Sequence, residues 1–464
     1  MERSAVKYLL KALGEGKVLT STISLESYAY DSSPFYHLPE VVVFPESTEE
    51  VSRVMEFCHR EGIAVTPRGA GTCLSGGAVP LAGGVALVLT RMNKILEVDL
   101  ANEAALVEAG VVNLDLQKAV DAFGYMFAPD PASQKVATIG GNIAEGAGGI
   151  RGVKYGVTKD HVLGLQVVLP TGEVVETGGL AAGVLPQVDL TGILVGSEGT
   201  LGVVTRALLR LTRKPEALQT IMAVFDSLEK AGEAVSRIIA RGIIPSTLEI
   251  MDGALTRAVD DFIQLGLPRD AEAMLLIEVD GFRREVSRHV EGITGVLRET
   301  GARGYRTAAD EQEREKLWLG RRSANGALGR IKPAYMVQDV TVPRDRLPEM
   351  LRRVTAVGEK YGVTIAQLAH AGDGNLHPHL LYDPHHPEEL HLAEQASREI
   401  FQAALEMEGT LTGEHGIGME KLEFMPRAFS ADDLGFMGSV KKAFDPEGLC
   451  NPGKVLPGSS EERG

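Results

Sequence analysis

The stretch PRGAGTCLSGGAV, residues 67–79, decides the fold of the first part of this chain, because four of its thirteen residues are glycine. It ends a predicted β-α-β unit: a strand over 41–44, a helix capped by Ser47 or Thr48, and a second strand over 63–65. Glycine lets backbone N–H groups converge on an anion without interference from a Cβ atom. The stretch is therefore a candidate phosphate-binding loop.

Two more glycine-rich stretches follow, TIGGNIAEGAGG at 138–149 and GSEGTLG at 196–202. One such loop is as often a plain tight turn as a ligand site, but three in one region favour phosphate binding. None matches GxGxxG or the P-loop pattern GxxxxGK[ST], which disfavours a Rossmann dinucleotide site and a nucleotidase.

Composition narrows the class of protein. The length of 464 residues predicts two domains, with three as the alternative. The hydrophobic fraction of 44% is ordinary for a globular protein. A net charge of −16 argues against bulk nucleic-acid binding. The three cysteines, Cys58, Cys73 and Cys450, form no CxxC pair, so neither an iron–sulfur site nor a zinc-thiolate site is predicted. Scattered thiols suit a reducing compartment.

The N-terminal residues 1–17 have apolar positions at helical spacing but no continuous apolar core, which predicts an amphipathic helix instead of a signal peptide. No apolar run is long enough to span a bilayer. We expect a cytoplasmic protein, with peripheral attachment to the inner membrane still compatible. The sequence is also compatible with a homodimer.

The pattern changes near residue 214. Before it, residues 162–177 predict a hairpin and Ala207–Thr212 a last strand. Beyond it, strand patterns alternate with amphipathic helices over 228–242 and 284–301, which predicts a sheet covered by helices. A polar tail, GSSEERG, ends the chain.

Histidines gather in HAGDGNLHPH, residues 370–379, between two strand-like segments. A hairpin would bring His370 and His377 to face each other, close enough to share one ion. A pair of histidines is usually structural, but Asp373, Asn375 and a distant GEHGIG motif favour a metal here. That motif adds Glu414 and His415, and chemistry alone does not say which of the two binds metal and which removes a proton. His379 is expected at the polar surface, or beside the ligands.

Six motifs stand in an order that resembles a known family: PRGAGTCLSGG, PDPAS, TIGGNIAEGAGG, DHVLGLQVVLPTGE, LTGILVGSEGTLGVVT and FDPEGLCNPGK. The chain resembles FAD-linked oxidases of the vanillyl-alcohol-oxidase fold, in the branch of glycolate oxidase flavin subunits and of D-lactate and D-2-hydroxyglutarate dehydrogenases. The resemblance covers nearly the whole chain. It implies an α+β, two-domain fold. Residues 1–214 with the tail 425–464 would form the PCMH-type FAD-binding domain, and residues 215–424 an α/β cap domain.

The resemblance also implies how FAD is held. The first glycine loop would cradle the pyrophosphate, the second would run along the flavin, the third would lie near the adenine or ribityl part, and Asn451 would close over the flavin. Thr72 stands where many members carry a histidine bound to the flavin, so noncovalent binding is expected. The expected FAD contacts are Pro67, Arg68, Gly69, Ala70, Gly71, Thr72, Ser75, Gly76, Pro129, Asp130, Ser133, Thr138, Gly141, Asn142, Ala144, Gly148, Glu198, Gly199, Val203, Val204 and Asn451.

For the metal, the resemblance implies the ligands His370, His377 and Glu414, with His415 as the base. Two histidines and a glutamate suit Zn²⁺, Mn²⁺ or Fe²⁺. Arg321 matches the family pattern W-x-x-R that begins at Trp318, and a planar guanidinium pairs well with a carboxylate. Asn375 is expected to give one more contact near substrate and metal. Arg322 lies outside the pattern.

These expectations define the expected reaction: a D-2-hydroxy acid, D-lactate or glycolate, is oxidised to its 2-oxo acid by hydride transfer to flavin N5. Residues 334–340, AYMVQDV, offer no cation for a second carboxylate, which weakly disfavours 2-hydroxyglutarate. Electrons would leave to an iron–sulfur subunit, an electron-transferring flavoprotein or a quinone. Two alternatives stay open at this point: a metal-dependent hydrolase, and a noncatalytic flavin subunit of a larger oxidase complex.

Overall fold

The computed structural model describes residues 2–180 and 188–458, and its contacts divide the chain into two compact units. Unit 1 comprises residues 1–148, 156–214 and 414–464, and unit 2 comprises residues 149–155 and 215–413. Helices and largely antiparallel sheets occur in both, so the α+β class is confirmed. The division differs from the expected ranges at two places, because residues 414–424 belong to unit 1 and residues 149–155 to unit 2.

Unit 1 contains two main sheets, a two-stranded ribbon and surrounding helices. The first sheet has the order β1-β2-β4-β3, the second has the order β5-β6-β10-β8-β9, and β11 pairs with β7. The strands are β1 (Val18–Leu19), β2 (Val41–Val43), β3 (Val65–Arg68), β4 (Val85–Val88), β5 (Ile95–Asp99), β6 (Ala104–Glu108), β7 (Tyr125–Met126), β8 (Val162–Val168), β9 (Val174–Gly178), β10 (Val203–Arg210) and β11 (Thr212–Arg213). The helices are α1 (Arg3–Leu13), α2 (Thr22–Glu26), α3 (Thr48–Glu61), α4 (Asn113–Asp121), α5 (Ile139–Glu145), α7 (Thr158–His161), α8 (Leu190–Leu194), α16 (Met425–Ala428) and α17 (Ala431–Phe444).

The expected β-α-β unit is formed by β2, α3 and β3. Helix α3 begins after Ser47, whose side chain accepts a hydrogen bond from the N–H of Glu50, and it ends at Gly62 in the left-handed conformation. β2 and β3 both run parallel to β4, which lies between them. Since β3 ends at Arg68, the first glycine loop starts at the carboxyl end of a parallel strand, the usual place for a ligand loop in such sheets.

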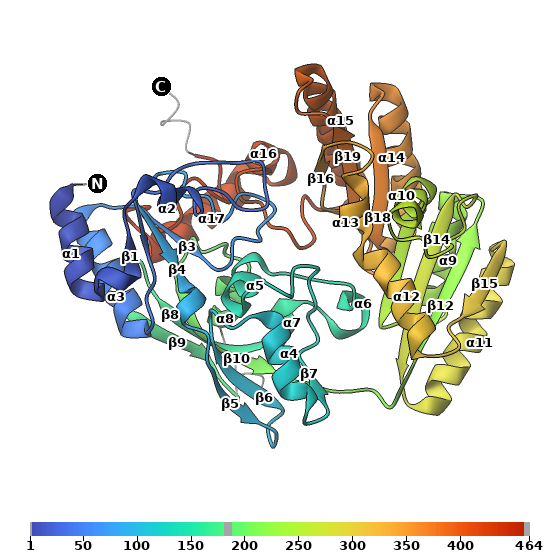
Figure 1. Cartoon of the computed structure of the whole chain (residues 1–464), viewed down its shortest axis with the longest axis horizontal. Helices are drawn as coiled ribbons and strands as arrows, with labels where there is room; N and C mark the ends of the chain where they lie inside the picture. The colour runs from blue at the N-terminus through green and yellow to red at the C-terminus, as the bar shows by residue number, and fades with distance from the viewer. Residues whose placement is uncertain (1, 181–187, 459–464) are drawn as a thin grey trace. The chain divides into compact units, whose positions relative to one another are not determined.

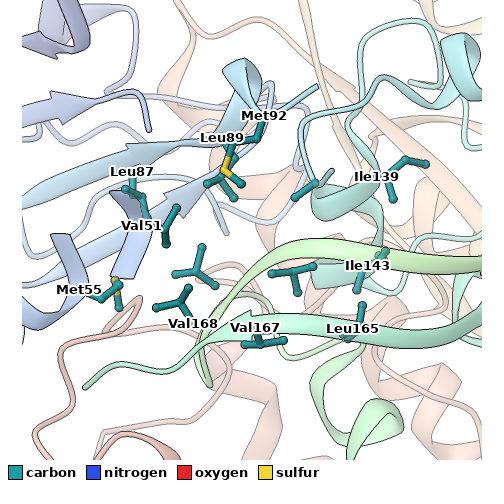
Figure 2. Packing of buried hydrophobic residues seen from close by; sticks show 14 of the residues in the cluster. Val51, Met55, Leu87, Leu89, Met92, Ile139, Ile143, Leu165, Val167 and Val168 are labelled. Atoms are coloured by element: carbon teal, nitrogen blue, oxygen red, sulfur yellow. The ribbon is translucent and has the colours of Figure 1, made fainter. Parts of the chain in front are cut away.

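The core of unit 1 joins the two sheets through α3. Figure 2 shows Val51 and Met55 of α3 near Leu87 of β4 and near Val167 and Val168 of β8. All five side chains are buried. One apolar cluster therefore fixes both sheets, and with them the loops that leave their strands.

The C-terminal segment returns to the first sheet of unit 1. Cys450 pairs with Val65 of β3 in a parallel bridge, in which Asn451 N–H donates to the carbonyl of Val65 at 2.7 Å. Figure 1 shows α16 and α17, in red, beside the blue N-terminal elements. The expected return of the tail to this domain is thus present for the residues that the structure describes, and the polar end from residue 459 lies outside them.

Unit 2 is built on one mixed-length antiparallel sheet with the order β15-β12-β14-β13-β18-β19-β16, and β17 pairs with β19. Its strands are β12 (Ala217–Phe225), β13 (Thr247–Asp252), β14 (Ala273–Gly281), β15 (Gly304–Thr307), β16 (Ala334–Val337), β17 (Val340–Thr341), β18 (Thr364–His370) and β19 (Asn375–Tyr382). Its helices are α6 (Gly152–Tyr155), α9 (Leu228–Ala240), α10 (Gly253–Ile263), α11 (Arg283–Glu299), α12 (Glu311–Arg322), α13 (Ala324–Leu328), α14 (Leu347–Tyr361) and α15 (Pro387–Glu406).

Helices cover both faces of this sheet. The helices α9, α11, α14 and α15 contact one another and several strands, and so form one layer. The other face packs against α10, α12 and α13, whose buried residues include Leu255, Trp318 and Leu328, together with Met251 and Leu276 of the sheet. This second face carries the polar residues described below.

The segment 149–155 packs in unit 2 although its neighbours in sequence belong to unit 1. Ile150 contacts the apolar cluster that contains Trp318. Lys154 donates a hydrogen bond to the carbonyl of Asp280 at 2.7 Å, and the Tyr155 hydroxyl donates to the Asp280 carboxylate at 2.7 Å. The carboxylate of Asp280, at the end of β14, thus holds this segment.

Within 2–180 and 188–458, every helix is too short or too polar to cross a bilayer.

The core of unit 1 yields the first prediction. Leu87 is fully buried in β4, so Leu87→Ala should lower the free energy of unfolding by about 2–5 kcal/mol through lost burial and a cavity. Leu96→Ala in β5 is the matched control, because Leu96 is 39% exposed and should change stability by only about 0.5 kcal/mol. Urea unfolding followed by circular dichroism measures both, and equal effects would contradict the assignment of the core.

Candidate functional site

The expected FAD contacts all lie in unit 1, at the ends of β3 and β10, in the loops beside them, in and around α5, and in the C-terminal tail. Pro67 and Arg68 end β3, and Gly69–Gly76 lie in the loop after it. Thr138 caps α5, which contains Gly141, Asn142 and Ala144, and Gly148 follows that helix. The others are Pro129, Asp130 and Ser133 in the loop before α5, Glu198 and Gly199 before β10, Val203 and Val204 in β10, and Asn451 in the tail.

The first glycine loop packs closely against the cap of α5. Thr138 Oγ1 accepts a hydrogen bond from the N–H of Gly141 at 3.2 Å, and a Cβ atom at position 69 would lie only 2.3 Å from that oxygen. At Gly71, which has a φ of 76°, a Cβ atom would overlap the guanidinium of Arg68. Glycine is required at both positions, and the backbone of the loop can approach α5 as a result.

Arg68 supports this loop from within the protein. Its guanidinium is buried and donates to the carbonyls of Tyr30 at 2.7 Å and Ala78 at 3.3 Å. Burial lowers the pKa of Arg68 from its usual value. Its observed contacts thus hold the two ends of the glycine loop, in addition to the expected role toward a pyrophosphate.

Two observations fit a bound FAD in unit 1. A cavity of about 160 Å³ lies where the first loop meets α5, with Ala70, Thr90, Val112 and Thr138 in its wall. Beside these loops, the amide nitrogen of Asn142 is buried and has no hydrogen-bond partner among the described residues. A buried donor without a protein partner is costly unless a ligand or water accepts from it. The glycine backbone and this amide therefore suit the polar parts of FAD.

Glu198 ties the third glycine loop to the GEHGIG motif. Its two carboxylate oxygens accept from the N–H groups of Ile417 at 2.6 Å and Gly418 at 2.7 Å. Ser75 of the first loop donates to the carbonyl of His415 at 2.9 Å. The residues that follow the expected base are thereby fixed on two of the loops expected to hold FAD.

Glu414 and His415 also lie among the glycines of unit 1. A Cβ atom at Gly148 would come within 2.7 Å of a Glu414 carboxylate oxygen. The other oxygen, Oε1, is 3.6 Å from His415 Nε2. The end of the second glycine stretch therefore packs closely against the side chain of Glu414, the expected third metal ligand.

Asn451 joins the tail to the same loops. Its amide donates to the carbonyls of Gly77 at 3.0 Å and Glu198 at 2.7 Å. Lys454 donates to Asn451 Oδ1 at 3.1 Å and to the carbonyl of Val79 at 2.7 Å. Burial lowers the pKa of Lys454 to about 8. The ammonium group therefore begins to lose its proton only slightly above neutral pH.

The two expected metal-binding histidines lie in unit 2 on adjacent strands. The hairpin of β18 and β19 is present, but its register pairs His370 with Asn375 and His377 with Leu368. The sequence predicts that the two histidines face each other across the hairpin. In the structure they are diagonal neighbours on one face of the sheet. Their rings lie 5.0 Å apart at an angle of 82°, and one ring nitrogen of each lies within 4.8 Å of the other.

The hydrogen bonds of these rings fit metal binding. His370 Nδ1 is 2.7 Å from Glu249 Oε1, and His377 Nδ1 is 3.4 Å from the carbonyl oxygen of Gln338. Since a carboxylate and a carbonyl can only accept, both Nδ1 atoms carry the hydrogen and both Nε2 atoms present a lone pair. Metal-binding histidines usually have this pattern, so the donor set in unit 2 fits a divalent cation.

Arg321 is anchored on the same face of the sheet. Its Nε donates to Glu249 Oε2 at 2.7 Å, so Glu249 serves the arginine and His370 at once. Burial alone would raise the pKa of Glu249, but the electrostatic influence and the hydrogen bonds of His370 and Arg321 outweigh burial and lower it. The carboxylate stays ionised. One turn earlier in α12, Trp318 donates its indole N–H to Glu278 of β14 at 2.9 Å.

Asn375 lies in a network with Asp339. Its amide donates to Asp339 Oδ1 at 2.8 Å and to Thr341 Oγ1 at 2.9 Å. The N–H of Gly413 donates to Asp339 Oδ2 at 3.0 Å. Because Gly413 is peptide-bonded to Glu414, the position of Asp339 restrains where the GEHGIG motif leaves unit 2.

His379 corrects one expectation. The sequence predicts His379 either at the polar surface or beside the ligands, and the first prediction is wrong because its side chain is buried. Its Nδ1 donates to the carbonyl of His377 at 2.7 Å, and its Nε2 is 3.2 Å from Asn325 Oδ1. The solvent-exposed Arg322 pairs with Glu315, as expected of a residue outside the W-x-x-R pattern.

Sequence reasoning missed Glu249, Asp339 and Gln338. The side-chain amide of Gln338 is buried and both of its polar atoms lack a partner among the described residues. The only signal in the sequence was a charged or polar residue inside an apolar strand pattern, as in STLEIMDG. Such a residue, when buried, has to meet a partner from another element.

Comparison with known proteins identifies the class. The family description "FAD linked oxidases, C-terminal domain" matches residues 214–455, and "FAD binding domain" matches residues 39–178. The solved 4-ethylphenol oxidase from Gulosibacter chungangensis superposes with a TM-score of 0.81 over 99% of this chain and 98% of that one, at 20% identity, which shows the shared fold.

Two curated relatives extend over nearly the whole chain. The glycolate oxidase subunit GlcD of Bacillus subtilis is 43% identical over 94% of this chain and 93% of its own length. The D-lactate dehydrogenase of Anaerostipes hadrus is 33% identical over 96% of each chain. The chain belongs to the FAD-linked oxidases, and it is a flavoprotein oxidoreductase of the glycolate oxidase GlcD and D-lactate dehydrogenase type.

The contact between Gly69 and Thr138 yields the second prediction. Gly69→Ala should displace the cap of α5 and lower the affinity for FAD about tenfold, which corresponds to about 1.4 kcal/mol. Adding Thr138→Ala removes the clashing oxygen, so the double variant should retain more FAD than Gly69→Ala alone. Gly16→Ala, where a Cβ atom meets nothing within 4 Å, is the control. The readout is the FAD-to-protein ratio by absorbance, and unchanged FAD in Gly69→Ala would exclude this loop from the FAD site.

Proposed function

We propose that the protein oxidises a D-2-hydroxy acid, D-lactate or glycolate, to the corresponding 2-oxo acid. The observation that carries this proposal is that the Glu249 carboxylate is hydrogen-bonded to both Arg321, the expected carboxylate anchor, and His370, an expected metal ligand, on one sheet face. A 2-hydroxy acid offers the two groups that such a pair would bind, a carboxylate and an adjacent hydroxyl. The two curated relatives are named for glycolate and D-lactate, which supports the same substrate class.

The substrate carboxylate would bind Arg321. Because its Nε is already occupied by Glu249, the two terminal nitrogens are the ones directed to the substrate, in the end-on geometry that suits a carboxylate. The charge of Arg321 is compensated by Glu249, so the arginine can stay nearly buried without substrate. Asn375 would orient the same substrate from its place on β19, and Asp339 fixes the amide.

His370, His377 and Glu414 would hold a divalent metal, and Zn²⁺, Mn²⁺ or Fe²⁺ suit this donor set. When bound, the metal supplies positive charge that lowers the pKa of a nearby hydroxyl. His415 would take the proton from the substrate hydroxyl as general base. Its carbonyl is held by Ser75, and the following residues are held by Glu198, which limits the movement of the backbone that carries the imidazole.

FAD, when bound, supplies the two-electron acceptor for hydride from C2 of the substrate. The glycine loops of unit 1 would hold it noncovalently, since Thr72 offers no ring nitrogen for attachment to the flavin. The three cysteines are free thiols at separate places in the sequence, so the described residues offer no iron–sulfur site. We propose that electrons pass to an iron–sulfur subunit, an electron-transferring flavoprotein or a quinone.

The substrate class gives the third prediction. In anaerobic solution, D-lactate or glycolate should bleach the flavin absorbance of the purified protein, and L-lactate should do so far more slowly. D-2-hydroxyglutarate should also be slow, because residues 334–340 provide no cation for its second carboxylate. A dye acceptor should then support turnover with the best substrate. If none of these acids bleaches the flavin in the metal-loaded protein, the proposal is refuted.

The fourth prediction separates the roles of Glu414 and His415. His415→Ala should keep FAD and metal but reduce the flavin about 10²–10⁴ times more slowly in a single turnover without acceptor, the usual contribution of a general base. Glu414→Ala should instead lose metal first and activity as a consequence. Metal content by elemental analysis, measured beside the reduction rate, decides between them. Loss of metal in His415→Ala with retention in Glu414→Ala would reverse the roles.

A further inference from the structure

Glu249 is the point at which two parts of the proposed site meet. It lies on β13, is 1% exposed, and stands directly opposite His370 in the register of β13 with β18. Its Oε1 accepts from His370 Nδ1 and its Oε2 accepts from Arg321 Nε, both at 2.7 Å. Each oxygen thus has one strong donor, and the two donors come from the neighbouring strand β18 and the helix α12.

The helix that carries Arg321 is fixed by a second carboxylate on the same face. Glu278 of β14 pairs in register with Thr247, two residues before Glu249 on β13. Glu278 Oε2 accepts from the Trp318 indole N–H at 2.9 Å and from Thr220 Oγ1 at 2.7 Å. Trp318 and Arg321 are one helical turn apart, so α12 meets two carboxylates that are diagonal neighbours on the sheet.

The hydrogen bonds of Glu249 have directional consequences. A carboxylate at His370 Nδ1 fixes the tautomer whose Nε2 presents a lone pair, and it holds the ring plane. The bond to Arg321 Nε fixes the plane of the guanidinium and leaves its terminal nitrogens for another carboxylate. Neither effect requires Glu249 to touch the substrate or the metal.

We propose that Glu249 is the positioning residue that aims His370 at the metal and Arg321 at the substrate carboxylate, and so couples metal binding to substrate binding. This inference rests on the proposed function, because it takes the roles of His370 and Arg321 from it. It goes further by assigning both roles to one buried side chain. Binding at either partner then changes how firmly Glu249 holds the other, which is a coupling of two binding equilibria.

The test is Glu249→Gln, which keeps the size of the side chain. Its amide has only one oxygen, so it can accept a hydrogen bond from His370 or from Arg321 but not from both through separate oxygens. Metal affinity should fall about 10- to 100-fold, measured with Zn²⁺ by competition with a chromophoric chelator. KM for the best substrate should rise about tenfold in the metal-saturated protein, while FAD content should not change. FAD content and metal affinity are readouts that do not depend on turnover.

Glu278→Gln is the matched control. It is the same substitution at a buried glutamate on the same face of the sheet, but the hydrogen bond and the ion pair of Glu278 go to Trp318 and Arg314 of α12. It should destabilise α12 and raise KM, with Zn²⁺ affinity unchanged. Equal loss of Zn²⁺ affinity in the two variants would show general loosening of the sheet and would overturn the assignment.

A second variant guards against failure to fold. Glu249→Asp keeps the charge but is one methylene shorter, so it can reach only one of the two partners. It should therefore either bind Zn²⁺ more weakly or have a higher KM, and it should retain FAD. In addition, Glu249→Gln combined with Arg321→Lys should raise KM by less than the product of the single effects, because both act on one contact. Strict multiplication of the two effects would contradict the coupling.

The outcomes separate this inference from the proposed function. If wild-type protein reduces its flavin with a 2-hydroxy acid and binds Zn²⁺, but Glu249→Gln matches it in both, only the role of Glu249 is wrong. If wild-type protein binds no metal or oxidises none of the acids, the proposed function fails, and the role of Glu249 fails with it.

Discussion

The two hydrogen bonds from backbone N–H groups to the Glu198 carboxylate are the interaction on which the arrangement of unit 1 depends. A buried carboxylate needs donors, and these come from residues 417 and 418, more than two hundred positions later in the chain. Glu198 itself has a positive φ of 52°, which is unusual for a residue with a side chain. The amide of Asn451 donates to the carbonyl of Glu198 at 2.7 Å, and the neighbouring Gly199 also has a positive φ. The three glycine loops and the C-terminal segment therefore form a single connected site.

In unit 2, polar residues that are distant in sequence are brought together on one face of the sheet. Most of one face is apolar and packs against α10, α12 and α13, but near β18 it carries Glu249, His370 and His377. Period-two alternation puts these residues on one face, and the antiparallel register decides which of them become neighbours. A slip of one residue between β13 and β18 would turn His370 away from Glu249. The chemistry of the site is thus specified by strand register as much as by residue type.

The strands β12 and β14 and the helices α9 and α11 were predictable, because their apolar residues follow clear periods of two and 3.6. The family motifs located the expected FAD loops, and the FAD-linked oxidase class is confirmed. Helix α5 was missed because its sequence, IGGNIAE, has two glycines that lower helix propensity, while the Thr138 cap and burial of Ile139 and Ile143 stabilise it in the structure. Glu249 was missed for another reason: its meeting with His370 depends on a register across 121 positions, which no local pattern encodes.

The placement of residues 149–155 bears on how such a chain can be divided. The backbone passes between the two units at four places, after residues 148, 155, 214 and 413, and not at the two that a plain insertion would need. A fragment of residues 215–413 would lack Ile150 and would leave the Asp280 carboxylate without Lys154 and Tyr155. Recombination or domain grafting at positions 214 and 413 alone would carry an incomplete cap. Chimeras that exchange the cap consequently need to exchange residues 149–155 together with residues 215–413.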